Sequence, residues 1–131
     1  MWRDRRGSSA MEFALVLPAF LFLSLGAIYL SMLMYSMTNL HQATEAAARW
    51  ASIQVTVSGT TPLTPPTPST VSAYAAGQYK GPNVSATFTY ANASPATAAN
   101  CGNRVTASGS FRLLTGLSTL TVPVGAQACF P

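Results

Sequence analysis

The stretch FALVLPAFLFLSLGAIYLSMLMYSM, residues 13–37, decides the fold because no charged side chain occurs anywhere along it. An α-helix rises about 1.5 Å per residue, so a helix of this length exceeds the roughly 30 Å hydrocarbon core of a bilayer. We therefore predict a transmembrane helix over residues 13–37. Pro18 lies inside it and cannot donate a hydrogen bond to the carbonyl of Ala14, so we expect a kink nearby.

The composition limits what else the chain can contain. Of its 131 residues, 49% are hydrophobic and only 8% are charged. Such a balance is unusual for a small soluble domain and fits one modest domain joined to a membrane segment. The length excludes a large enzyme.

The basic residues predict the orientation of the helix. Arg3, Arg5 and Arg6 precede the apolar stretch, and no further Lys or Arg follows until Arg49. The positive-inside rule then places the N-terminus in the cytoplasm and the rest of the chain outside it. The remaining basic residues form no stripe, so we expect no nucleic acid as a partner. The apolar stretch makes the lipid bilayer an expected partner.

Cys101 and Cys129 would then lie in an oxidising compartment, where a pair is more often bridged than free or metal-bound. We predict a disulfide between them, although the sequence alone does not decide this. In the loop-entropy model such a bond contributes roughly 3 kcal/mol to a small core.

A short motif stands directly before the apolar stretch. RRG is followed by SSAMEF, so that Gly7 precedes Glu12 and Phe13 in the pattern G-x-x-x-x-E-F. This motif resembles the leader of type IV pilins and pseudopilins. The resemblance implies that a prepilin peptidase cuts between Gly7 and Ser8 at the cytoplasmic face, so that residues 1–7 are a removable basic leader. It also implies that Glu12 and Phe13 take part in docking between subunits during assembly.

The resemblance narrows along the chain. The segments EFALVLP and AAARWAS, and the ending VTASGSFRLLTGLSTLTVPVGAQA, are similar to those of TadE-like proteins, minor pilins or pseudopilins of the tight-adherence (Tad, or Flp) pilus system. This implies a pilin-like α+β fold and a structural, non-enzymatic role in the bacterial inner membrane or in a surface pilus. The implied partners are other pilin or pseudopilin subunits and the inner-membrane assembly platform. An unprocessed single-pass protein with an extracytoplasmic binding module remains the alternative.

The helix is expected to continue beyond the membrane. Leu40, Ala43, Ala47 and Trp50 recur at spacings of three and four, which predicts one helix over residues 8–51. Within it, small residues at 24, 27 and 31 would let another helix approach closely, although they are equally typical of ordinary lipid-facing positions; they are Ser24, Ala27 and Ser31.

Two further segments complete the predicted organisation. Residues 52–70 are expected to be an extended exit, in which Ile53, Val55 and Val57 alternate with polar neighbours, followed by a Pro/Thr-rich linker from Ser58 to Thr70. Residues 71–131 are predicted to form a small extracytoplasmic α+β domain.

In this domain we expect a short helix and a three-stranded antiparallel sheet. Val71, Tyr74 and Ala75 share one helical face, with a start at Ser69 or Thr70 and a stop at Gly77 or Gly81. Apolar residues alternate with polar ones in three segments, at Val84–Tyr90, Val105–Phe111 and Leu120–Ala128. So small a sheet must pack on something apolar, and we expect the end of the long helix near Trp50 and the short helix near Tyr74.

The ingredients of catalysis are scarce. The only acids are Asp4, Glu12 and Glu45, and His41 is the single histidine. These residues support neither a catalytic triad nor a metal site, so we expect no catalytic residue, no metal and no cofactor.

Overall fold

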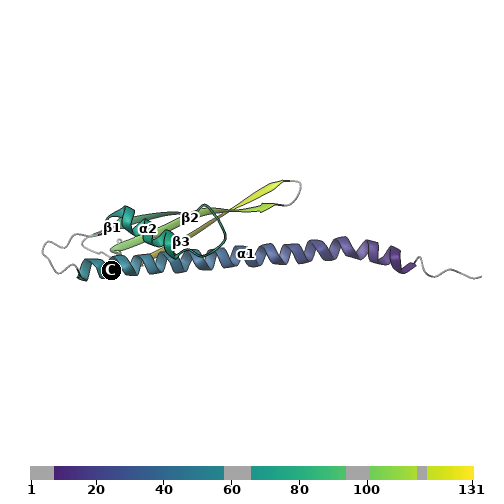
Figure 1. Ribbon diagram of the computed structural model, residues 1–131, viewed down its shortest axis with the longest axis horizontal. Helices are drawn as coiled ribbons and strands as arrows, with labels where there is room; N and C mark the ends of the chain where they lie inside the picture. The colour runs from purple at the N-terminus through teal and green to yellow at the C-terminus, as the bar shows by residue number, and fades with distance from the viewer. Residues whose placement is uncertain (1–7, 58–65, 94–100, 115–117) are drawn as a thin grey trace, which may run out of the picture. The chain divides into compact units, whose positions relative to one another are not determined.

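The structure is a computed structural model that describes residues 8–57, 66–93, 101–114 and 118–131. Two helices precede three strands, in the order α1 (Ser8–Val57), α2 (Pro68–Gln78), β1 (Thr87–Asn92), β2 (Asn103–Leu114) and β3 (Thr119–Phe130) (Figure 1). The predicted α+β layout is confirmed. The chain divides into two units, Met1–Met32 and Leu33–Pro131, and the boundary falls inside α1.

The described part of the first unit is a bare apolar helix. Its side chains are exposed on every side, with Phe13 at 65%, Leu15 at 81% and Phe22 at 80% exposure. A helix that is apolar all round belongs in an apolar surrounding. By length and composition, Ser9–Gln54 of α1 can cross a membrane. The helix continues through Pro18, and the expected kink there stays a prediction.

In the second unit α1 has one buried face and one exposed face. Seven small or medium side chains at spacings of three, four and one are buried against the rest of the unit; they are Ser36, Leu40, Ala43, Thr44, Ala47, Ala48 and Ala51. Because five of the seven are alanine or serine, the neighbouring elements can approach the helix backbone closely. The predicted inward positions Leu40, Ala43 and Ala47 are confirmed.

The predicted extended exit after Ala51 is wrong. The α1 helix runs on through Ile53 to Val57, and the Ser52 hydroxyl donates to the carbonyl of Arg49 one turn back. The β-branched residues here cost only a few tenths of a kcal/mol each in a helix, which is too little to end one already anchored by buried Ala47 and Ala51.

The α2 helix also begins earlier than predicted. Thr67 is its N-cap, its side-chain oxygen accepting a hydrogen bond from the Thr70 amide, and Pro68 takes the first helical position, which suits its fixed φ and missing N–H. Residues 68–70 are therefore helical rather than part of the extended linker. Linker residues 58–65 lie outside the described residues.

The α2 helix ends at Gln78, close to the predicted stop at Gly77. The Tyr79 amide, as the C-cap, donates to the carbonyl of Ala75. Val71 and Ala75 are buried, and the Tyr74 ring stacks on the Trp50 ring of α1 with centroids 4.9 Å apart and planes 12° from parallel. The sequence predicted that the sheet packs near Trp50 and Tyr74, but it did not predict this direct contact between the two helices.

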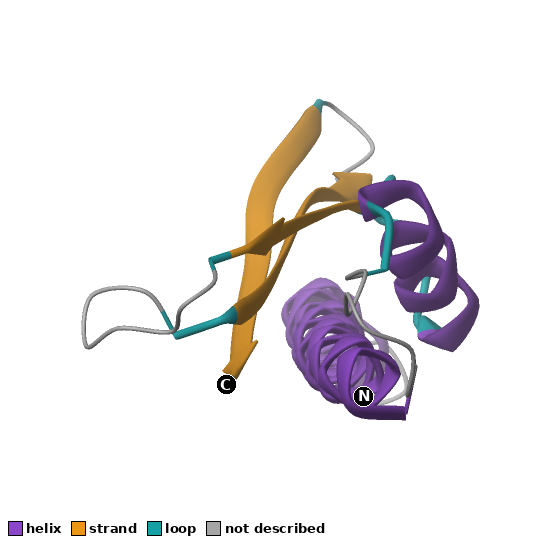
Figure 2. Cartoon of the chain, turned by 90° about the vertical axis from the view of Figure 1, so that its left-hand side faces the viewer, coloured by secondary structure: helices purple, strands orange, loops and turns teal. Residues whose placement is uncertain are grey.

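The sheet is antiparallel in the order β1-β2-β3. The β1 strand covers only the first half of β2, from Asn92↔Asn103 to Thr87↔Ser108, whereas β3 pairs with β2 along its whole length. Residues 109–114 and 119–124 thus continue as a two-stranded extension, called here the β2–β3 arm. Figure 2 shows the three strands as one twisted layer.

The predicted alternation of the strands holds where the sheet has a core to cover. Its inward positions are Phe88, Val105, Ala107, Phe111, Val124, Ala126 and Ala128. The first strand starts at Thr87 rather than at Val84, because Ser85 has a φ of 49° that interrupts the extended chain. Val84 is still buried, and its carbonyl accepts from the Ser110 amide at 2.9 Å.

Candidate functional site

The predicted processing and docking residues lie at the start of α1. The helix begins at Ser8, and Glu12 and Phe13 follow one turn later, both exposed. Gly7 lies outside the described residues, so the Gly7–Ser8 bond itself cannot be placed. Met11, Leu15 and Val16 surround Glu12 along the helix, and all three are exposed and apolar.

Glu12 is the single charged side chain among the described residues of the first unit. A carboxylate in an apolar surrounding is costly unless a cation or several donors meet it. If the helix enters a bilayer or a bundle of similar helices, Glu12 therefore needs a positive partner close to the start of a helix.

The two serines among the small residues of α1 hydrogen-bond to backbone carbonyls of their own helix. The Ser24 hydroxyl donates to the Leu21 carbonyl at 3.1 Å, and the Ser31 hydroxyl donates to the Ala27 carbonyl at 2.8 Å. Both hydroxyls are thus satisfied within their own helix. Ala27 and Ser31 are exposed and Ser24 is half-buried, so close helix packing at these positions stays a prediction.

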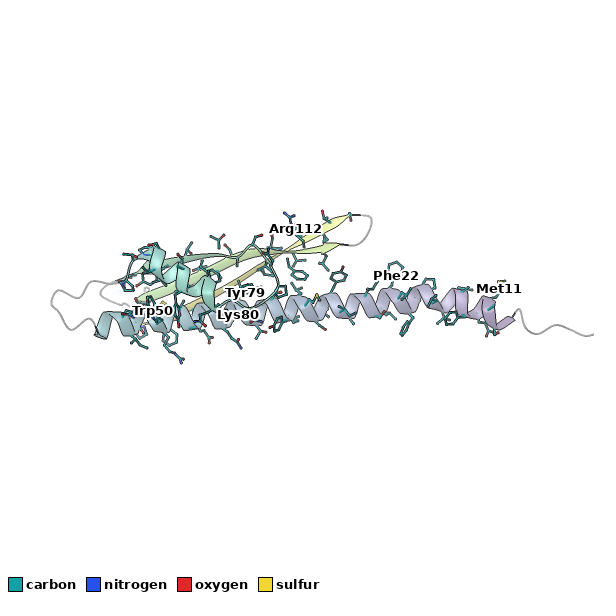
Figure 3. The ribbon with its side chains drawn as sticks, in the orientation of Figure 1. Met11, Phe22, Trp50, Tyr79, Lys80 and Arg112 are labelled. Atoms are coloured by element: carbon teal, nitrogen blue, oxygen red, sulfur yellow. A yellow bond between two sulfur atoms is a disulfide. The ribbon has the colours of Figure 1, made fainter. Side chains whose placement is uncertain are left out.

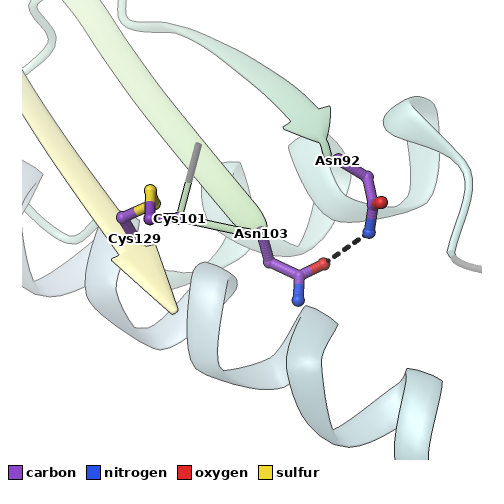
Figure 4. The surroundings of a disulfide bond; sticks show 4 residues. All are labelled: Asn92, Cys101, Asn103 and Cys129. Atoms are coloured by element: carbon purple, nitrogen blue, oxygen red, sulfur yellow. Dashed lines mark hydrogen bonds between the residues drawn. A yellow bond between two sulfur atoms is a disulfide. The ribbon is translucent and has the colours of Figure 1, made fainter. Parts of the chain in front are cut away.

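Cys101 and Cys129 form a disulfide, as predicted, with Cα atoms 5.9 Å apart (Figure 4). The bond ties Cys101, two residues before the start of β2, to Cys129 near the end of β3. Gly102, between Cys101 and β2, has a φ of +89°, a conformation that glycine adopts without strain and that brings its position to within contact of the Phe130 carbonyl.

Sequence reasoning missed a polar cluster at the same end of the sheet. Asn103 is buried, and its side-chain oxygen accepts from the Tyr90 hydroxyl at 2.6 Å and from the Asn92 amide at 2.9 Å. These bonds compensate the burial of a polar group. Only the register of β1 on β2 brings the three residues together, so the linear sequence carries no signal for them.

A cationic contact lies on the helix side of this end. The Arg49 guanidinium of α1 sits over the Phe130 ring of β3, 5.3 Å from its centroid. Such a cation–π contact contributes about 0.5–1 kcal/mol at an exposed site. It fixes the end of β3 near the last turns of α1.

A second missed cluster surrounds Tyr79, in the segment between α2 and β1. Its hydroxyl donates to the Pro82 carbonyl at 2.6 Å, and the buried Ser36 side chain of α1 hydrogen-bonds to it as well. Burial raises the pKa of Tyr79 above 10.0, the Ser36 hydrogen bond lowers this pKa, and Tyr35 raises it. The ring folds over Gly81, where a Cβ would collide with it.

The described residues offer no metal centre. No group of three or more His, Cys, Asp or Glu side chains gathers within residues 8–57, 66–93, 101–114 and 118–131. The described residues thus provide an exposed apolar section of α1 that carries Glu12, and a second unit that holds a disulfide and two polar clusters.

The comparison with protein families agrees with this arrangement. A family model described as "TadE-like protein" matches residues 7–49, which comprise the whole apolar part of α1 and most of its packed part. No curated protein and no solved structure gives a significant match. Through this N-terminal segment, which holds Glu12, the apolar helix and the packing face of α1, the chain is similar to TadE-like proteins.

Proposed function

We propose that this chain is a minor pilin or pseudopilin, a structural subunit held in the bacterial inner membrane by α1 and assembled with other subunits of a Tad pilus. The TadE-like match to residues 7–49 supports a pilin-like protein associated with that system. The observation that carries the finer proposal is the described part of the first unit, a helix that is exposed and apolar on all sides and holds Glu12 as its one charge.

In this proposal a prepilin peptidase cuts after Gly7, so that Ser8 acquires a positively charged amine. The arginines of the leader hold the N-terminus in the cytoplasm, and the chain beyond the apolar section of α1 lies on the other side of the membrane. The presence of an oxidised Cys101–Cys129 pair supports that side, because disulfides persist in oxidising compartments.

Glu12 then acts in docking. The carboxylate of one subunit pairs with the Ser8 amine of the next, a pairing favoured because an unpaired charge in an apolar surrounding costs at least a few kcal/mol. Pairing would set the register at which two apolar helices associate. The inner-membrane assembly platform and the pilin subunits are the partners that this role requires.

The mass of the chain extracted from membranes tests the processing step. We expect the intact mass to lack Met1 through Gly7 and the first residue to be Ser8. An intact leader would instead support the alternative, a single-pass membrane protein that is not processed.

A matched pair of variants tests the site of the cut. Gly7→Glu should leave the leader in place, because a bulky charged side chain obstructs a peptidase that selects a bare backbone. Asp4→Asn changes the leader charge by one without touching the bond and should be cut normally. A Gly7→Glu chain that still begins at Ser8 would show that the proposed processing is wrong.

A further inference from the structure

The β2–β3 arm ends in a set of side chains that the pilin role does not use. Beyond the reach of β1, Leu120 is 57% exposed, Leu113 is half-buried and Arg112 is exposed. A two-stranded extension is only marginally stable in water, and exposed apolar side chains near its end indicate an interaction surface.

Two contacts within the second unit fix the direction in which the arm points. At the end of the sheet opposite to the arm, Phe130 pairs with Asn103 and contacts Arg49, so this end lies near the last turns of α1. Further along, the Ser110 amide donates to Val84, in the segment between α2 and β1. The arm therefore points away from Arg49.

The same segment between α2 and β1 is tied to the other end of the α1 section in this unit. Tyr79 hydrogen-bonds with Ser36, three residues after Leu33, where the unit begins. In Figure 3 Trp50 is labelled at one end of the unit, and Tyr79, Lys80 and Arg112 are labelled toward the other.

The lengths of the elements agree with this direction. At about 1.5 Å per residue, Tyr35 lies roughly 22 Å along α1 from Trp50. At about 3.3 Å per residue, Arg112 lies roughly 30 Å along β2 from Asn103. Measured from Asn103, β2 is thus long enough for Arg112 on the arm to reach at least the level of Tyr35.

The side chains at this end have a common chemistry. Tyr35 is 54% exposed, Lys80 and Arg112 are exposed cations, and Leu113 and Leu120 are apolar. Glu45 is the only carboxylate side chain of residues 33–131, and it lies ten residues further along α1 than Tyr35. Tyrosine, leucine and basic side chains together are typical of the interface between a membrane and water.

We propose that this end of the second unit, defined by Tyr35, Lys80, Arg112, Leu113 and Leu120 and called here the membrane-facing end, rests on the bilayer surface from which α1 emerges. Leu113 and Leu120 enter the interface, and Lys80 and Arg112 bind the phosphates of anionic lipids. The inference rests on the proposed anchoring of the chain by α1.

Charge complementarity selects lipid as the occupant. A second copy of the unit would bring its own cations and a single carboxylate to this surface, whereas anionic headgroups supply phosphate oxygens in excess. Continuity argues the same way, because α1 passes from its exposed apolar section directly into the section that carries Tyr35.

The experiment uses the full chain reconstituted in vesicles of phosphatidylglycerol and phosphatidylcholine. An environment-sensitive dye is attached to a single new thiol, which is possible because Cys101 and Cys129 are engaged with each other. Leu120→Cys is the test position, and Gln127→Cys, exposed near the other end of the same strand, is the matched control. Phe22→Cys on α1 reports the anchoring itself.

We expect the dye at position 120 to emit at shorter wavelength than the dye at 127, and lipids with a quencher near the headgroup to quench it severalfold more. Adding Lys80→Glu and Arg112→Glu, or using phosphatidylcholine alone, should reduce that quenching. The dye at position 22 should be quenched by lipids with a deep quencher throughout.

Each contrary result has its own meaning. If the dyes at positions 120 and 127 are quenched alike while the dye at position 22 is quenched, the chain is anchored but the membrane-facing end does not contact the bilayer, which overturns the proposal. A signal at 120 that depends on the protein-to-lipid ratio and not on lipid charge means that another copy covers the arm, which overturns the proposal. If position 22 is not quenched, the anchoring fails and the inference fails with it.

Discussion

Glu12 shows how much one side chain can determine when its surroundings are uniform. It stands one turn after Ser8, and the side chains beside it are apolar and exposed. In water such a carboxylate is well solvated, but inside a bilayer an unpaired charge is costly, so pairing with a nearby cation is favoured. The proposed Ser8 amine satisfies that requirement only after the leader is removed, so processing and docking would be coupled in order.

Replacing Glu12 tests the docking role. Glu12→Val and Glu12→Gln should be cleaved and inserted normally, because neither change touches the Gly7–Ser8 bond or shortens the apolar section. Both should lose co-purification with other pilus subunits and lose surface filaments, as counted by shearing and electron microscopy. Ser9→Ala, an exposed neighbour on the same helix, serves as the control, and full piliation by Glu12→Val would reject the docking role.

Tyr79 supplies the second prediction at this scale. Tyr79→Phe removes the hydrogen bonds to Pro82 and Ser36 and should lower the free energy of unfolding by about 1–2 kcal/mol at pH 8. Pulse proteolysis in urea on the detergent-solubilised chain measures the loss. Tyr74→Phe is a suitable comparison, since Tyr74 contributes its ring to a stack.

The pH dependence of that difference follows from the pKa of Tyr79. Burial raises this pKa in the folded chain, so the unfolded chain ionises first as the pH rises. The stabilisation is fully present below the unfolded pKa of about 10 and is lost above it. The gap in unfolding free energy between the parent and Tyr79→Phe should therefore narrow between pH 8 and pH 11, and a gap that widens contradicts the assignment.

At the scale of elements, the contact between α1 and α2 joins the two helices of the second unit. Trp50 and Tyr74 join the packed section of α1 to α2 by a stacked pair, and Thr67 with Pro68 sets where α2 begins. The cap thus sets where α2 begins, and the aromatic stack together with buried Val71 and Ala75 holds α2 in the unit.

A double-mutant cycle measures the aromatic contact. Trp50→Ala and Tyr74→Ala should each destabilise the second unit, and the double variant should lose less than the sum by about 0.5–1.5 kcal/mol. Tyr90→Phe combined with Trp50→Ala provides a control pair that is not in this stack. Additivity of the Trp50 and Tyr74 effects in pulse proteolysis would show that the stack contributes nothing.

The elements also show what local sequence patterns can predict. The apolar stretch predicts the first part of α1, and alternation predicts the inward residues of β2 from Val105 to Phe111. The exit at Ile53–Val57 was mispredicted because three alternating residues are too few to distinguish a strand from the end of a long helix. The exposed Leu120 broke the alternation rule because the arm extends past β1, and strand register is not visible in the sequence.

At the scale of the whole molecule, the disulfide joins residues 28 positions apart and links the start of β2 to the end of β3. Cys101→Ser and Cys129→Ser should each lower the free energy of unfolding by about 2–5 kcal/mol, as loss of a native bridge does in a small secreted domain. The two variants should behave alike in pulse proteolysis, and Thr121→Ser on β3 should resemble the parent. Free thiols in the native chain would contradict the bond.

The candidate site was predicted unevenly across the molecule. Residues close in sequence, such as Gly7, Glu12 and Phe13, form a motif that resembles a pilin leader, and the roles that this resemblance implies stay predictions. Asn103 and Tyr79 could not be recognised from the sequence, because their partners come from other elements and depend on how those elements pack. The TadE-like match to residues 7–49 follows the same division, since it covers the helix and leaves the sheet unmatched.

The stack of Trp50 on Tyr74 has an optical consequence. The chain contains two tryptophans, Trp2 and Trp50, and the proposed cut after Gly7 removes the first. The processed protein would then carry a single indole, held 4.9 Å from a tyrosine ring that can transfer excitation to it. Its fluorescence would report the docking of α2 on α1 without any added dye, while the drop in absorbance on losing Trp2 would record the processing.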